Sequence, residues 1–114
     1  MNRIECLNEL LEFKVSLSTL SKNLSEFDWD YEEEPTLIKV HHILKVLQSY
    51  LDEKLSASDL EGWANLIEGR EDLDFDPKHA EELEDIFHSL ANPVLEGKIS
   101  KIKCTDYINR IQDL

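Results

Sequence analysis

Carboxylates are the side chains of this sequence whose number and spacing can do chemistry, by binding either cations or a basic surface. One group lies in residues 26–35, EFDWDYEEEP, where acids alternate with Phe27, Trp29 and Tyr31 before three glutamates and a proline. Aromatic rings supply contact area with little loss of conformational freedom, and carboxylates select a basic partner. The pattern predicts a surface that another protein covers. The alternative is that the rings pack into the protein's own core and the acids face water.

The net charge of −13 is concentrated in two segments. Residues 26–34 contain six acids and no base, and residues 68–85 contain nine acids against Arg70 and Lys78. These contributions, −6 and −7, account for the whole excess, because the rest of the chain carries ten acids and ten bases. Crowded like charges destabilise a fold, so we expect a cationic partner to relieve them. Nucleic acid and anionic membranes would be repelled and are not expected as partners.

Paired carboxylates one helical turn apart raise an enzymatic alternative. Glu68 with Glu71, and Glu82 with Asp85, resemble the acid pairs by which all-helical nucleotide pyrophosphatases hold magnesium against a triphosphate. Pro77 interrupts the segment between the two pairs. The sequence also has no obvious cluster of lysine or arginine residues that could bind the phosphates. We keep a magnesium-dependent hydrolase as the alternative. Our main expectation is a protein that is not an enzyme and uses no metal or cofactor.

The histidines and cysteines indicate no nucleophilic site, because they occur in no triad, zinc or phosphate-loop pattern. Cys6 and Cys104 lack metal spacing and are too few for a disulfide scaffold, which predicts two reduced thiols in a cytoplasmic protein. His41 falls on the apolar side of a predicted helix, so we expect it to be a hydrogen-bonded core histidine.

The apolar spacing predicts an all-α protein, a small bundle of five or six amphipathic helices in a single domain over residues 1–114. A chain of this length can bury about 65% of its unfolded surface around one core. No apolar run approaches the roughly 18 residues of a membrane span, and the first residues lack a signal peptide's apolar stretch. We therefore expect a cytoplasmic protein.

Caps, prolines and glycines predict where the helices begin and end. Trp63 shares the apolar stripe of Leu60 and Ile67 and is predicted to lie in the core, while residues 70–76 are expected to form an acidic loop. No strand is predicted. The expected start and stop signals are Ser16 or Ser18, Pro35, the capping box Ser58–Glu61, Gly69, Asp76–Pro77, Asn92–Pro93 and Ser100.

A small, all-helical and strongly acidic chain resembles the immunity proteins that neutralise bacterial nuclease toxins, including the partners of colicins and of contact-dependent growth inhibition toxins. The run LLEFKVSLSTLSKNLSEFDWDYEEE is similar to them in layout: a helix, a short K-V-S break, a second helix, then an aromatic residue and acids. The segment DLEGWANLIEGREDLDFD, residues 59–76, is similar to one that recurs in small bacterial helical proteins found beside toxin genes.

The resemblance implies inhibition by occlusion, in which an acidic, aromatic-anchored surface covers the active site or nucleic-acid groove of a basic nuclease toxin, a ribonuclease in preference to a deoxyribonuclease. The free protein is expected to be a monomer or a weak homodimer. An acidic interaction module or antitoxin for another basic partner is the alternative, and residues 68–76 are equally expected as a solvated helix end. The predicted partner-binding residues are Asp28, Trp29, Asp30, Tyr31, Glu32, Glu33, Glu68, Glu71, Asp72, Asp74 and Asp76.

Overall fold

Helices account for most of the structure. The computed structural model describes residues 2–27 and 33–114, and these form seven helices and two short strands. In chain order the elements are α1 (Arg3–Glu12), α2 (Leu17–Leu24), β1 (Thr36–Ile38), α3 (Val40–Leu51), α4 (Ala57–Ile67), β2 (Leu73–Phe75), α5 (Ala80–Ala91), α6 (Pro93–Glu96) and α7 (Lys101–Ile111). Among these helices, none is long and apolar enough to cross a membrane.

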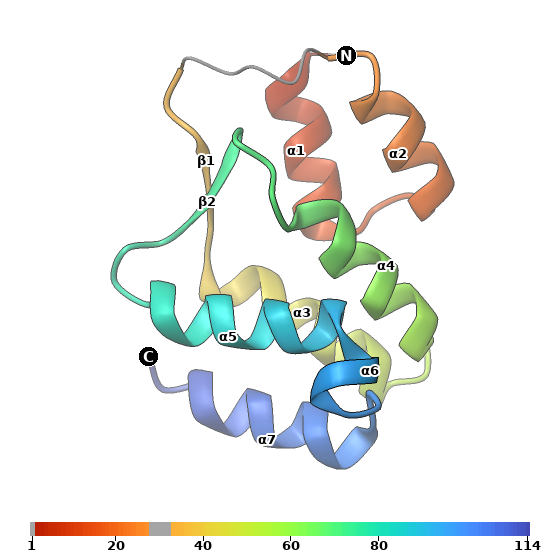
Figure 1. Cartoon of the computed structure of the whole chain (residues 1–114), viewed down its shortest axis with the longest axis vertical. Helices are drawn as coiled ribbons and strands as arrows, with labels where there is room; N and C mark the ends of the chain where they lie inside the picture. The colour runs from red at the N-terminus through yellow and green to blue at the C-terminus, as the bar shows by residue number, and fades with distance from the viewer. Residues whose placement is uncertain (1, 28–32) are drawn as a thin grey trace.

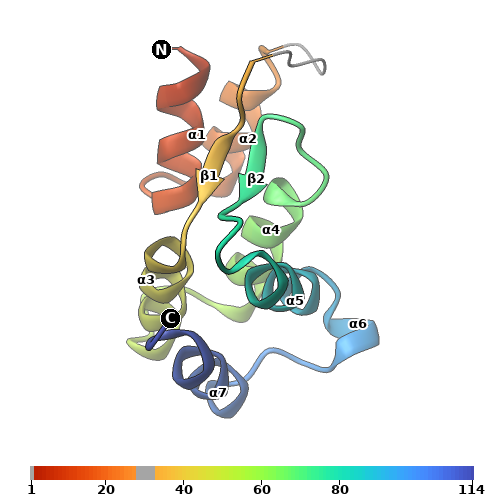
Figure 2. The ribbon, with the colours of Figure 1, turned by 90° about the vertical axis from the view of Figure 1, so that its left-hand side faces the viewer.

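The helices form two groups that α4 and the strands connect. Figure 1 shows α1 and α2 as an antiparallel pair at one end of the molecule, and α3, α5 and α7 together at the other. Helix α4 packs on both α2 and α5, so it ties the two groups into one body. The strands run side by side along one flank (Figure 2), and their register pairs Thr36 with Leu73 and Ile38 with Phe75 in parallel.

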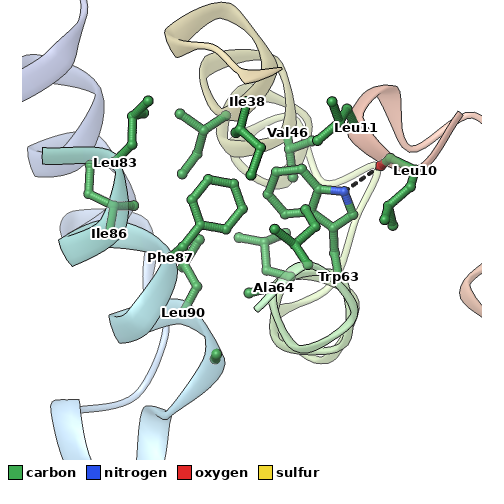
Figure 3. Close-up of a cluster of buried hydrophobic side chains, with 14 of the residues drawn as sticks. Leu10, Leu11, Ile38, Val46, Trp63, Ala64, Leu83, Ile86, Phe87 and Leu90 are labelled. Carbon is green, nitrogen blue, oxygen red and sulfur yellow. Dashed lines mark hydrogen bonds between the residues drawn. The ribbon is translucent and has the colours of Figure 1, made fainter. Parts of the chain in front are cut away.

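Trp63 on α4 lies at the centre of the core, as its apolar stripe predicts. Its side chain is fully buried, and its Nε1–H donates a hydrogen bond to the backbone carbonyl of Leu10 at 2.6 Å (Figure 3). The Phe87 ring of α5 lies 5.0 Å from the Trp63 ring, centroid to centroid. One residue therefore joins α1, α4 and α5, and its only polar atom is satisfied inside the core.

Several helix ends follow the predicted signals. Ser16 and Ser100 accept backbone N–H bonds from Thr19 and Lys103 and cap α2 and α7. Gly69 adopts a φ of 80° just after α4, a conformation that costs glycine little. The predicted cap of α4 is wrong by two residues. Ser56, not Ser58, exchanges the reciprocal cap bonds with Asp59, and Ser56–Asp59 has the same serine-then-acid spacing two residues earlier in the chain.

The prediction of no strand is wrong, as is the count of five or six helices. Residues 36–38 do not belong to the third helix, which begins at Val40, and the predicted loop 70–76 contains β2. Both strands are three residues long, too short for a period-2 pattern to be recognised. The turn at Asp76–Pro77 does not start α5, which begins at Ala80; the Asp76 carboxylate instead accepts the Lys78 N–H at 3.2 Å. The extra helix is the four-residue α6.

The prediction that His41 is a hydrogen-bonded core histidine is wrong, and it is His42 whose ring accepts a hydrogen bond. His41 is exposed, because Ile43, Val46 and Leu47 set the buried face of α3 on the opposite side of the helix. His42 is partly buried, and its Nδ1 accepts the backbone N–H of Lys39 at 2.9 Å. Burial, helped by the neighbouring His41, lowers the pKa of His42 to about 4, so the ring is neutral when it accepts this bond.

Candidate functional site

Most of the first predicted patch lies outside the described residues, namely Asp28, Trp29, Asp30, Tyr31 and Glu32. Their predicted contacts therefore stay predictions. The structure does describe the two ends of the segment. Glu33 is exposed just before β1, and Phe27 is partly buried against the core with the Arg3 guanidinium 5.4 Å above its ring. The first ring of the segment thus belongs to the protein's own packing.

The second predicted patch divides into separate environments, beginning with Asp72. Asp72 is only 3% exposed, and Arg70 donates two hydrogen bonds to its carboxylate at 2.8 and 2.9 Å. The Nε of Arg3 lies 3.4 Å from the same carboxylate. A planar guanidinium that meets a carboxylate with two parallel bonds gives a strong, oriented ion pair. Asp72 therefore joins α1 to the segment before β2, and its charge is not presented at the surface.

Glu71 and Asp76 have different surroundings. Glu71 is exposed and borders a surface hollow of about 270 Å³ between the ends of α2 and α4. Phe27 and Leu66 supply apolar walls of that hollow, and Arg70 a polar one. Asp76 is partly buried, holds the turn before α5 and lies 4.0 Å from Lys39. Neither residue lines the hollows that contain the remaining two acids of the patch.

Glu68 and Asp74 instead join the acids of α5. Glu68, Asp74 and Glu84 line one hollow beside β2, and Glu68 and Glu84 also line a wider, open hollow of about 640 Å³ along α5. We call these neighbouring carboxylates the acidic face. It consists of Glu68, Asp74, Glu81, Glu82, Glu84 and Asp85.

Helix geometry explains why α5 carries this face. Residues 84 and 85 lie three and four positions after residue 81, and residue 88 lies four and three positions after them, so all four share one side of the helix. Leu83, Ile86, Phe87 and Leu90 occupy the other side and are buried in the core (Figure 3). The apolar packing of α5 therefore turns its carboxylates outward together, whatever their mutual repulsion.

Few cations neutralise the acidic face among the described residues. Arg110 of α7 lines the wide hollow and lies 3.3 Å from Asp85, but both side chains are well exposed. His88 lies between two acids, 3.7 Å from Glu68 and 3.5 Å from Glu96 of α6. Six carboxylates thus line these two hollows together with two arginines and a histidine, and Arg70 is already hydrogen-bonded to Asp72.

Four residues of the acidic face were absent from the predicted contacts, namely Glu81, Glu82, Glu84 and Asp85. The signal for them was present in the sequence. They contribute four of the nine acids counted in residues 68–85, and the apolar stripe of the helix already places most of them on its outer side. The prediction concentrated on the acids before the helix, two of which hold the fold together.

The acid pairs of the hydrolase alternative do not all line one hollow. Among residues 2–27 and 33–114, no group of three or more histidine, cysteine or carboxylate side chains is placed to hold a metal ion. The first pair is divided between two hollows. Glu71 borders the α2–α4 hollow, whereas Glu68 lines the one along α5 together with Glu82 and Asp85. Three of the four acids therefore share a hollow, and Glu71 lies outside it.

The cysteines are two separate buried thiols. Cys6 lies on α1 and Cys104 on α7, each in the core. Burial raises the pKa of the Cys104 thiol to about 11 and raises that of Cys6 as well. Because the reactive species is the thiolate, both side chains behave as small apolar core residues at neutral pH.

Comparison with known proteins gives no relative: no family model matches the chain, and no curated protein or solved structure is significantly similar to it.

Proposed function

We propose that this chain is an immunity protein that neutralises a basic bacterial nuclease in the cytoplasm, a ribonuclease in preference to a deoxyribonuclease. The acidic face would cover the nuclease's active site or its nucleic-acid groove and replace the phosphates that the groove otherwise binds. The observation that carries the proposal is the gathering of six carboxylates on the outer side of α5 and its neighbours, where the nearby arginines are Arg110 and the Asp72-bound Arg70.

The physical argument rests on the cost of that arrangement. Like charges at three- and four-residue spacing on a helix destabilise it by a few tenths of a kcal/mol per pair, about 0.2–0.5. The acids add only weak surface interactions, such as the exposed Asp85–Arg110 pair and that of Glu81 with the helix N-terminus, because the core side of α5 already holds the helix in place. A cationic partner removes the repulsion and is drawn toward the face from a distance, which speeds association.

An adaptor for a basic protein that is not a nuclease is the second candidate. It is favoured by the same acidic face and requires no active site in the partner. Nuclease inhibition separates the two functions, since an adaptor would bind its partner without blocking catalysis.

The test uses the fact that an immunity gene lies directly beside its toxin gene. The nuclease domain encoded by the adjacent gene is purified and its RNA cleavage is measured while the chain is titrated in. We expect inhibition at one-to-one stoichiometry and protection of cells that express both proteins. Two results contradict the proposal: an adjacent gene that encodes no basic toxin, or tight binding that leaves cleavage unchanged.

A charge-reversed variant connects this activity with the acidic face. In Glu81→Lys with Glu84→Lys, we expect the inhibition constant to rise at least about 100-fold. The matched control is Glu5→Lys with Asp52→Lys, which changes the net charge equally at exposed positions on α1 and after α3. If the control loses as much inhibition as the α5 variant, net charge alone governs binding and the acidic face is not the contact surface.

A further inference from the structure

His88 differs in kind from the other residues around the wide hollow along α5. It lies in the last turn of α5, is exposed, and lines that hollow with Arg110 and five carboxylates of the acidic face. Carboxylates and guanidinium groups keep their charge between about pH 5.5 and 7.5, whereas an imidazole gains or loses a proton there. Of the described residues that line this hollow, His88 is therefore the one whose charge changes near neutral pH.

Both ring nitrogens of His88 lie close to carboxylates from other parts of the chain. Nδ1 is 3.7 Å from Oε1 of Glu68, just after α4, and Nε2 is 3.5 Å from Oε1 of Glu96 in α6. The Asn92 side-chain nitrogen lies 3.3 Å from Nδ1 and donates to the His88 backbone carbonyl at 2.8 Å. A neutral ring that accepts from Asn92 at Nδ1 carries its hydrogen on Nε2, the nitrogen nearer Glu96. A second proton would occupy Nδ1 and place an imidazolium between the two carboxylates.

The other ionisable groups around His88 keep a constant charge near neutral pH. The acids among them are Glu81, Glu84 and Asp85 on α5 and Asp74 in β2, and the cations are Arg70 before β2 and Lys103 and Arg110 on α7. Tyr107 of α7 bonds to Ser89 through its hydroxyl, and a phenol loses its proton only far above neutral pH. His79, just before α5, lines neither of the two hollows beside the acidic face. A change in the charge of this surface between about pH 7.5 and 5.5 is therefore assigned to His88.

We infer that His88 makes the acidic face sensitive to pH, because its second proton competes with a cationic partner for the same carboxylates. The inference rests on the proposed function, since it concerns the regulation of the same surface. A protonated His88 pairs with Glu68 and Glu96 and repels a lysine or arginine that docks beside it. Docking therefore favours the neutral ring, and the displaced proton goes to the solvent. By linkage, a cationic partner binds more weakly as the pH falls from about 7.5 to 5.5.

The position of His88 at the surface sets the size of this effect. One extra positive charge beside a docked lysine acts through a partly solvated surface, which weakens but does not remove the repulsion. At low salt we expect binding about three- to tenfold weaker at pH 5.5 than at pH 7.5. At physiological salt the difference should shrink, because the Debye length falls to about 8 Å.

Titration calorimetry with N-acetylated octalysine amide measures the effect without the nuclease, since the charge of this peptide is constant over the range. Its affinity is measured at about pH 7.5 and 5.5 in about 20 mM salt. Proton release is counted at about pH 6.5 from titrations in two buffers of different ionisation enthalpy. We expect the wild type to bind the peptide about three- to tenfold more weakly at the lower pH and to release a fraction of a proton on binding.

Two histidine variants decide whether His88 is responsible. His88→Gln should lose at least about half of the proton release and most of the pH dependence, because the competing proton is gone. The matched control His41→Gln, at an exposed histidine on α3, should keep both. Equal pH dependence in the wild type and His88→Gln, or a peptide that does not bind at all, would overturn the inference. Inhibition of the adjacent nuclease at pH 7.5 tests the proposed function separately, so an inhibitor whose peptide binding ignores pH would contradict the inference alone.

Discussion

Asp72 and the carboxylates of α5 belong to one acidic segment of the sequence but have opposite surroundings. Asp72 is 3% exposed and is held by Arg3 and Arg70, one from the start of the chain and one from the turn before β2. Glu81, Glu84 and Asp85 are exposed, and of these three only Asp85 forms an ion pair with an arginine among the described residues. The carboxylate of Asp72 therefore helps to hold the fold together, whereas the carboxylates of α5, a few residues later, are exposed and not needed by the fold. We call such acids surplus.

The difference shows what a count of charges leaves out. Removing a carboxylate from water costs several kcal/mol, so a buried acid persists only where cations and hydrogen bonds compensate for its desolvation. An exposed acid keeps its hydration, so it has no desolvation cost and needs no compensating ion pair. Function is best sought among acids whose removal the fold would tolerate, which directs attention to α5 and away from Asp72.

The largest expected effect comes from removing the buried charge. Asp72→Asn leaves two arginines without their shared carboxylate in a largely desolvated place, and we expect about 3–5 kcal/mol of lost stability. Urea denaturation measures the free energy of unfolding. The adjacent Glu71→Gln, at an exposed position, should change it by less than about 0.5 kcal/mol. Equal losses in the two variants would remove the distinction between structural and surplus acids.

The neighbouring histidines of α3 extend the comparison from acids to a base. His42 has a folded pKa of about 4, below the unfolded value of 6.5, because it is buried. The unfolded chain therefore takes up a proton at His42 before the folded protein does, and stability falls as the pH drops from about 6.5 toward 4. Since solvent reaches part of the ring, we expect His42 to account for a loss of about 1–2 kcal/mol over that range.

Urea denaturation between about pH 7 and pH 4 detects this contribution. His42→Gln should flatten the profile, although it lowers stability at neutral pH by weakening the bond to the Lys39 N–H. His41→Gln, at the exposed neighbour, should change the slope of the profile less, because burial, the larger cause of the lowered His42 pKa, remains. A steeper dependence in the His42 variant would mean that the buried ring is charged in the folded protein.

The smallest effect on stability is expected on the acidic face itself. Glu81→Lys with Glu84→Lys relieves repulsion along α5 but forfeits a favourable interaction of Glu81 with the helix N-terminus. These terms oppose one another, so the free energy of unfolding should change by less than about 1 kcal/mol. A loss as large as that of Asp72→Asn would mean that the acidic face supports the fold and is not surplus.

Much of the fold was predictable because its signals are local. Serine caps, a glycine after α4 and the stripe around Trp63 each act within one or two helical turns. The strands were not predictable, because a parallel pair of three-residue strands is defined by a partner far along the chain and not by its own pattern. The choice between Ser56 and Ser58 also exceeded local information, since each is followed by an acid three residues later.

The candidate site was predictable only as a region. The charge count correctly indicated that residues 68–85 carry surplus acid, and the helical spacing of residues 81–85 was visible. The burial of Asp72 was not, because it depends on Arg3 folding back from the opposite end of the chain. The tertiary structure decides which acids are buried in ion pairs and which are exposed. A charge count from the sequence cannot separate the two groups.

The most direct test of the central claim is the association rate between this chain and the nuclease domain encoded beside it, measured by stopped flow at several salt concentrations. If the acidic face attracts a basic partner, Glu81→Gln with Glu84→Gln should lower the rate constant about tenfold or more at low salt and flatten its salt dependence. The dissociation rate should change much less. An unchanged rate constant and salt slope in this variant would contradict the claim that the surplus charge of α5 exists to capture a cationic partner.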